Sequence, residues 1–185
     1  MTRAALLRAG AVAGAATLLP AGVAHAALPA PAPVADDLAF LQFCTIAERA
    51  ALAYYRRTGD RTAARQKTDH VARLTAALGA DAPSDDDFTI ALPAGAFRTP
   101  ARTRALGIRI ESLLVGVLLS GVTSTADGST RLLLGRLLAN DAQHLAGLRR
   151  AAGLPGVQGL PVPMELEAAG AELDALLKTT NYPTT

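Results

Sequence analysis

Apolar side chains recur three or four residues apart along five stretches of this chain, a spacing that places them on one face of an α-helix. No stretch combines β-branched and aromatic residues in the strict alternation typical of strands. Ala and Leu, which lose little entropy in a helix, dominate the composition. We therefore predict an all-α protein with helices over residues 38–55, 61–78, 101–122, 129–152 and 163–178.

The breaks between these helices differ in length. Residues 58–60 and 123–128 are short polar turns, and a short turn makes the next helix antiparallel to the one before it. Residues 81–100, with an acidic run, prolines and a glycine, are interpreted as one long crossover between the second and third helices. Two helical hairpins joined by one long crossover form the ferritin-like arrangement of a four-helix bundle, to which a short C-terminal helix is added here.

Individual residues mark where the helices start and stop. Asp36 and Asp37 are expected to cap the first helix, since a carboxylate accepts hydrogen bonds from free backbone N–H groups. Gly79 is expected to end the second helix. Pro163 is expected to begin the fifth, where a missing N–H costs nothing.

The N-terminus has the pattern of a signal peptide. Arg3 and Arg8 precede an uncharged apolar stretch, and Ala24-His25-Ala26 fits the small-x-small cleavage rule. We predict a signal peptide over residues 1–26, and hence export, with an uncleaved anchor as the alternative. The segment around Arg3 looks like a twin-arginine signal with one arginine missing, which leaves the export route open. A Pro/Ala linker would follow over 27–35, then the bundle over 36–155 and a C-terminal helix and tail over 156–185.

Charge argues against one class of function. The chain has 18 Lys and Arg against 16 Asp and Glu. Removal of Arg3 and Arg8 with the signal peptide leaves 16 of each. A balanced chain without a basic run gives no electrostatic reason to bind nucleic acid. We expect no nucleic-acid partner, and no transmembrane segment in the mature form.

The apolar faces carry polar residues that a buried surface rarely accepts unless they are paired or bound to metal. Each of the first four helices has at least one acid or histidine on its inner stripe. The set is Glu48, His70 with Lys67, Glu111, and Asp141 with His144.

These residues also agree in height along the helices. Glu48 and His70 each lie 11 residues from Gly59, and Glu111 and Asp141 each lie 15 residues from Ala126. In antiparallel hairpins, residues at equal distances from the turn lie side by side. Asp141-Ala142-Gln143-His144 adds an acid and a histidine three residues apart, which project from one helix face and can bind one ion.

On these motifs the sequence resembles the ferritin-like domain family of exported bacterial proteins, over about Leu38 to Pro155. The matching segments are Leu41-Gln42-Phe43 with Ala47-Glu48, His70 to Gly79, Leu92 to Phe97, Ile110-Glu111, and Asn140 to His144. The resemblance implies a metal site of iron or manganese, with Glu48, His70, Glu111, Asp141 and His144 as ligands.

The chain departs from the family pattern at two positions. Asp141 replaces a glutamate, and Lys67 stands where the second helix would supply a glutamate three residues before His70. A lysine there would repel a metal cluster. Two hypotheses remain open: a metal-binding bundle, with one ion or two, or a non-catalytic structural or interaction module in which Lys67 pairs with the buried acids.

The sequence leaves several properties undefined. It names no substrate and no protein partner, and it does not decide whether the chain is an enzyme. A third option, an iron-storage shell of many identical chains, requires an oligomer, and no oligomer interface can be read from the sequence.

Overall fold

A computed structural model describes residues 35–84, 88–156 and 161–178, and every structural statement below concerns these residues. They form five α-helices and two short 3-10 helices, and no β-strand occurs among them. The prediction of an all-α protein is therefore confirmed. Residues 1–34, with the expected signal peptide and nearly all of the expected linker, lie outside the described residues, as does the acidic run at 85–87.

The helix boundaries follow the predicted ones to within a few residues. In the described part of the crossover, residues 79–84 and 88–99, the only helical elements are the 3-10 helices η1 and η2. The elements are α2 (Ala35–Thr58), α3 (Arg61–Leu78), η1 (Gly79–Asp81), η2 (Ala94–Phe97), α4 (Pro100–Ser124), α5 (Gly128–Ala151) and α6 (Leu166–Lys178).

Side-chain caps fix where three of the helices begin. The carboxylate of Asp60 accepts from the N–H of Ala63 at 3.0 Å and starts α3. The Thr99 hydroxyl does the same for α4, directly before Pro100 at the first helical position. Asp127 caps α5 in the same way. Gly79, with φ of 58°, ends α3 as expected, because that backbone conformation disfavours a side chain.

The prediction that Asp37 caps the first helix is wrong. The helix begins at Ala35, and Asp37 lies within it, 2% exposed. Its two carboxylate oxygens accept from the N–H groups of Ala126 and Asp127, each at 3.1 Å. Asp37 therefore caps the turn between α4 and α5, a partner 89 residues away that local sequence does not reveal.

The predicted start of the last helix at Pro163 is also wrong, since α6 begins at Leu166. Residues 161–165 have no regular secondary structure, and the N–H of Met164 donates to the carbonyl oxygen of Gly116 at 3.0 Å. The proline at 163 disfavours helix at the residue before it, which is consistent with a helix that starts only after it. Gly116 favours this approach, because a Cβ there would lie 3.2 Å from the Val162 carbonyl oxygen and the segment would have to shift by a few tenths of an ångström.

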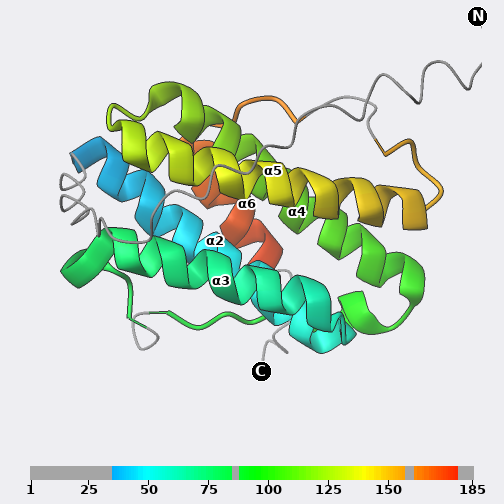
Figure 1. Cartoon of the computed structure of the whole chain (residues 1–185). Helices are drawn as coiled ribbons and strands as arrows, with labels where there is room; N and C mark the ends of the chain where they lie inside the picture. Colours follow the sequence, from blue (N-terminus) through cyan, green and yellow to red (C-terminus); the bar gives the residue numbers. More distant parts are fainter. Residues whose placement is uncertain (1–34, 85–87, 157–160, 179–185) are drawn as a thin grey trace, which may run out of the picture. The chain divides into compact units, whose positions relative to one another are not determined.

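The long helices pack in pairs around a common core. Consecutive helices α2 and α3 pack against each other, as do α4 and α5, and Figure 1 shows each pair side by side. The pairs meet through contacts of α2 with α4 and of α3 with α5, and α6 covers α2 and α4. This packing directs one face of each of the first four helices into the same interior.

One described helix, α4, is long and apolar enough to cross a membrane by length and composition alone. However, 67% of its most apolar stretch is buried inside the protein. Its core face is almost entirely aliphatic and glycine, with Glu111 and Ser120 as the polar exceptions. Burial by the other helices accounts for this composition without a membrane.

Candidate functional site

The polar residues predicted to face the interior do so. Glu48 on α2, Lys67 on α3, Glu111 on α4 and Asp141 on α5 are each 0% exposed, and His70 on α3 is 6% exposed. His144 is half-buried. Four helices thus bring three acids, two histidines and one lysine into a single charged cluster.

The Lys67 ammonium lies at the centre of this cluster. Its Nζ is 2.7 Å from Asp141 Oδ1, 3.0 Å from Glu48 Oε2 and 3.2 Å from Glu111 Oε2. These three acids belong to the three other long helices. Lys67 therefore points into the core and does not extend along its stem to solvent.

The histidines extend the cluster in two directions. His70 Nδ1 is 2.9 Å from Glu48 Oε1 and 3.5 Å from Asp141 Oδ1. His144 Nδ1 is 3.4 Å from Glu111 Oε1, and its Nε2 is 2.8 Å from Gln66 Oε1. The levels inferred from the turns are consistent with this geometry, because the partners predicted at equal heights share hydrogen bonds or a common ammonium.

Two members of the network were not predicted as part of a site. The Tyr55 hydroxyl donates to Glu111 Oε1 at 2.8 Å. Gln66, which contacts His144, precedes His70 by one helical turn, and that spacing is the signal that could have identified it. Asp69 is exposed and pairs with Arg73 at 2.6 Å, so it contributes nothing to the core.

Burial and mutual charge set the protonation of the cluster. Burial alone would lower the pKa of Lys67, but the three carboxylates outweigh it and raise that pKa, so the amine stays charged. Burial also raises the pKa of Glu111, but Lys67 and His144 outweigh it and the net pKa is lowered. Glu111 is therefore the ionised partner of Lys67.

The remaining carboxyls are less acidic. Burial raises the pKa of Glu48, with Lys67 opposing it only in part. Burial, reinforced by the charge of Glu48, raises the pKa of Asp141 well above its ordinary value. Burial lowers the pKa of His70, which favours its neutral ring. Glu48 and Asp141 are thus the carboxyls that take up a proton first, which limits the negative charge around one ammonium.

Two sets of donors have the spacing to hold a metal ion. Glu48, His70 and Asp141 offer ligand atoms within 4.8 Å of one another, and so do Glu111, Asp141 and His144. Carboxylate oxygen and imidazole nitrogen are suitable ligands for iron or manganese. Asp141 belongs to both sets.

The position of Lys67 conflicts with metal binding at either set. Asp141, which belongs to both sets, is also the carboxylate nearest the ammonium, at 2.7 Å, so an ion bound to it would lie next to a positive charge. Two unit charges about 4 Å apart repel by about 4 kcal/mol at an effective dielectric of about 20, and a divalent ion doubles that repulsion. The donors therefore fit a metal ion only if Lys67 leaves the cluster, and do not fit one while it stays.

Comparisons with protein families, with curated proteins and with solved structures found no match to this chain. The assignment of the site therefore depends on its own chemistry.

Proposed function

We propose that this chain is an exported ferritin-like module in which the Lys67 ammonium replaces the metal cations that the family holds in its core. The observation that carries the proposal is the contact of one buried Nζ with carboxylates from three other helices, all within 3.2 Å. The ammonium thereby supplies the positive charge that these acids need in a dry interior.

The ferritin-like part of the proposal is supported by the element order. Two antiparallel helix pairs, a crossover of about twenty residues between them and one acid directed inward from each of three helices are features of that arrangement. Export is supported by the sequence of the first 26 residues, with the arginines, the apolar stretch and the small-residue cleavage pattern.

The function that follows is structural and binding, without metal chemistry in the core. An ion network that joins four helices fixes their register, because shifting one helix would leave a buried charge unpaired. Recognition of other molecules would then take place on the outer faces of the helices.

A second candidate is a single iron or manganese ion held by one of the two donor sets. The spacing of their ligand atoms, within 4.8 Å, favours it. In that case Glu48, His70 and Asp141, or Glu111, Asp141 and His144, would hold the ion, which would supply Lewis acidity or redox chemistry. The ammonium would have to move out of the core first.

The test is metal content by mass spectrometry after incubation with Fe²⁺ or Mn²⁺, for the wild-type protein and for Lys67→Glu. The proposal expects no bound metal in the wild type. Lys67→Glu would supply a fourth carboxylate in place of the ammonium, and we expect it to bind about one or two ions per chain. Lys67→Glu with Glu111→Ala is the matched control and should lose that gain.

The outcomes separate the two candidates. One or more ions per wild-type chain, lost in Glu111→Ala, would overturn the proposal and establish the second candidate. A folded Lys67→Glu variant that stays free of metal would show that Lys67 is not what excludes the ion.

A further inference from the structure

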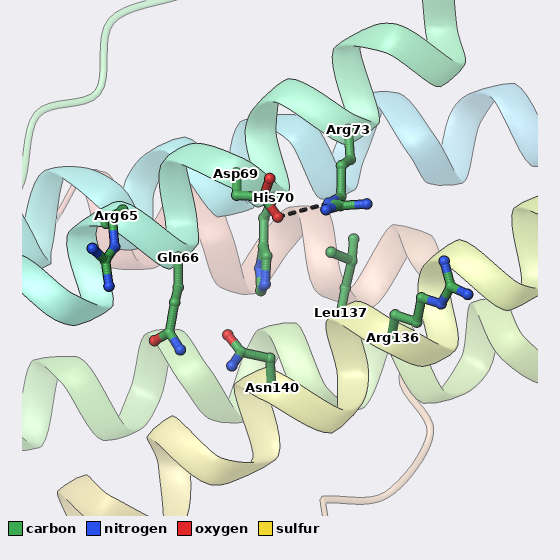
Figure 2. A pocket seen from close by; sticks show the side chains of 8 residues that line it. All are labelled: Arg65, Gln66, Asp69, His70, Arg73, Arg136, Leu137 and Asn140. Carbon is green, nitrogen blue, oxygen red and sulfur yellow. Dashed lines mark hydrogen bonds and ion pairs between the residues drawn. The ribbon is translucent and has the colours of Figure 1, made fainter. Parts of the chain in front are cut away.

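A cleft of about 600 Å³ lies between α3 and α5, on the outer side of the charged cluster. Figure 2 shows the side chains that line it, from both helices. Those that matter chemically are Arg65, Gln66, His70 and Arg73 on α3, and Arg136 and Asn140 on α5. The volume is within the range of about 300–1,000 Å³ typical of small-molecule sites.

The rim of this cleft carries an excess of positive charge. Three guanidinium groups face one carboxylate, that of Asp69, which is already paired with Arg73 at 2.6 Å. Among the residues that the structure describes, no carboxylate lies within ion-pair distance of Arg65 or Arg136. The rim therefore has a net charge of +2. Figure 2 shows Arg65 at one end of the cleft and Arg73 and Arg136 toward the other, so the positive charge is spread along its length.

The floor of the cleft has polar groups that are not satisfied. His70 directs Nδ1 inward to Glu48, and Gln66 directs its carbonyl oxygen to His144, so the second ring nitrogen and the amide NH₂ remain for another partner. Asn140 Oδ1 is buried and has no hydrogen-bond partner within the described part of the chain. In Figure 2 the Gln66 and His70 side chains extend from α3 toward α5. A buried polar group without a partner indicates a missing ligand or water.

We infer that this cleft binds a small molecule through a dianionic phosphate group. A phosphate monoester carries a charge of about −1.5 to −2 at neutral pH, which matches the net charge of the rim. Guanidinium groups bind phosphate oxygens with two parallel hydrogen bonds, and the amide NH₂ of Gln66 supplies a neutral donor. Asn140 Oδ1 is an acceptor, so it would take a hydrogen bond from a hydroxyl group of the ligand and not from the phosphate. Leu137, on the same wall, offers an apolar contact for the rest of the ligand.

The inference goes beyond the proposed function and does not depend on it, since the arginines lie outside the charged cluster. It also agrees with a core free of metal, because a rim of positive charge disfavours the approach of a divalent cation past His70.

The test is isothermal titration calorimetry of the full chain with inorganic phosphate and with glycerol 3-phosphate, at low and at physiological salt. The variant is Arg65→Gln with Arg136→Gln. Both residues are exposed, so the fold should be unaffected. We expect the affinity to fall by more than about tenfold, because the rim loses its two positive charges that have no carboxylate partner among the described residues.

The matched control is Arg102→Gln with Arg150→Gln, two exposed arginines outside the cleft that give the same change in net charge. It should bind like the wild type. A vesicle-flotation assay, with phosphatidylcholine alone or mixed with phosphatidic acid, distinguishes a lipid headgroup from a soluble phosphate ester as the source of the phosphate group. The inference is overturned if neither phosphate compound nor the phosphatidic acid vesicles bind, or if both double variants lose affinity equally.

Discussion

Two layers of the core occupy equivalent positions on the same four helices and differ in chemistry. One contains Glu48, Lys67, Glu111 and Asp141, and the other lies seven residues along each helix and contains Leu41, Leu74, Leu118 and Leu134. All eight side chains are 0% exposed. Seven residues are two helical turns, so the layers are about 10 Å apart.

The two layers differ in how the stability of the protein responds when one of their residues is substituted. In the leucine layer every side chain contributes its own burial, about 1.5–3 kcal/mol, whatever its neighbours are. In the charged layer, each charged side chain stabilises the fold only while its partners of opposite charge are present, because an unpaired buried charge is strongly destabilising. The two layers are equally buried, but the leucines contribute to stability independently of one another, whereas the contribution of each charged residue depends on the others.

Lys67→Met tests this dependence most severely. The substitution keeps a similar volume but leaves three acids without a cation, so we expect the free energy of unfolding to fall by about 3–5 kcal/mol. Urea denaturation followed by circular dichroism measures it. Adding Glu48→Gln, Glu111→Gln and Asp141→Asn should recover most of the loss, whereas a loss below about 1 kcal/mol for Lys67→Met alone would mean that the acids do not need the ammonium.

Leu118→Ala tests the other layer. Truncation leaves a cavity among aliphatic side chains, and we expect a loss of about 3 kcal/mol. The same denaturation experiment measures it, at neutral pH and again at pH 9. The loss should be the same at both values, and a loss that varied with pH would show that the two layers are coupled.

Alkaline pH gives the smallest but most selective effect. The pKa of folded Lys67 lies above its ordinary value of 10.5, so the unfolded chain releases this proton first. Its stabilisation is complete below pH 10.5 and is lost as the pH rises through the folded pKa. The slope reaches about 1.4 kcal/mol per pH unit.

The two variants isolate this contribution. Leu118→Ala keeps Lys67 and should keep the alkaline slope, whereas Lys67→Met should have a smaller one. Burial and the charge of Glu111 raise the pKa values of Tyr54, to about 12, and of Tyr55, but both tyrosines are present in either variant. Equal slopes would contradict the assignment of a charged ammonium at the centre.

Much of the fold was predictable because local signals are strong here. The helical period, the turn around Gly59 and the helix end at Gly79 depend on residues that are close together in the sequence. Asp37 shows the limit of such signals. Its position in the sequence suggests a cap of the first helix. It instead caps the turn between α4 and α5, which lies near Asp37 only in the packed structure.

The candidate site was predictable in composition but not in its central interaction. Helical spacing places Glu48, His70, Glu111 and Asp141 on inner faces, and the turn distances set their heights. The direction of Lys67 was undetermined, because a long flexible side chain can reach either solvent or core from the same backbone position. The contact of Gln66 with His144 depends on how α3 lies against α5, which sequence periodicity does not define.

Glu111 has a further consequence for the helix that carries it. In the 25 residues of α4 it lies one position from the middle, in the helix whose length and hydropathy suit a lipid bilayer. An acid at the centre of a hydrocarbon core costs about 2.5–3.5 kcal/mol on an insertion scale. The Glu111 carboxylate, which pairs with Lys67 in the protein core, therefore also disfavours insertion of α4 into a lipid bilayer. Glu111→Leu would remove both this cost of insertion and the ion pair.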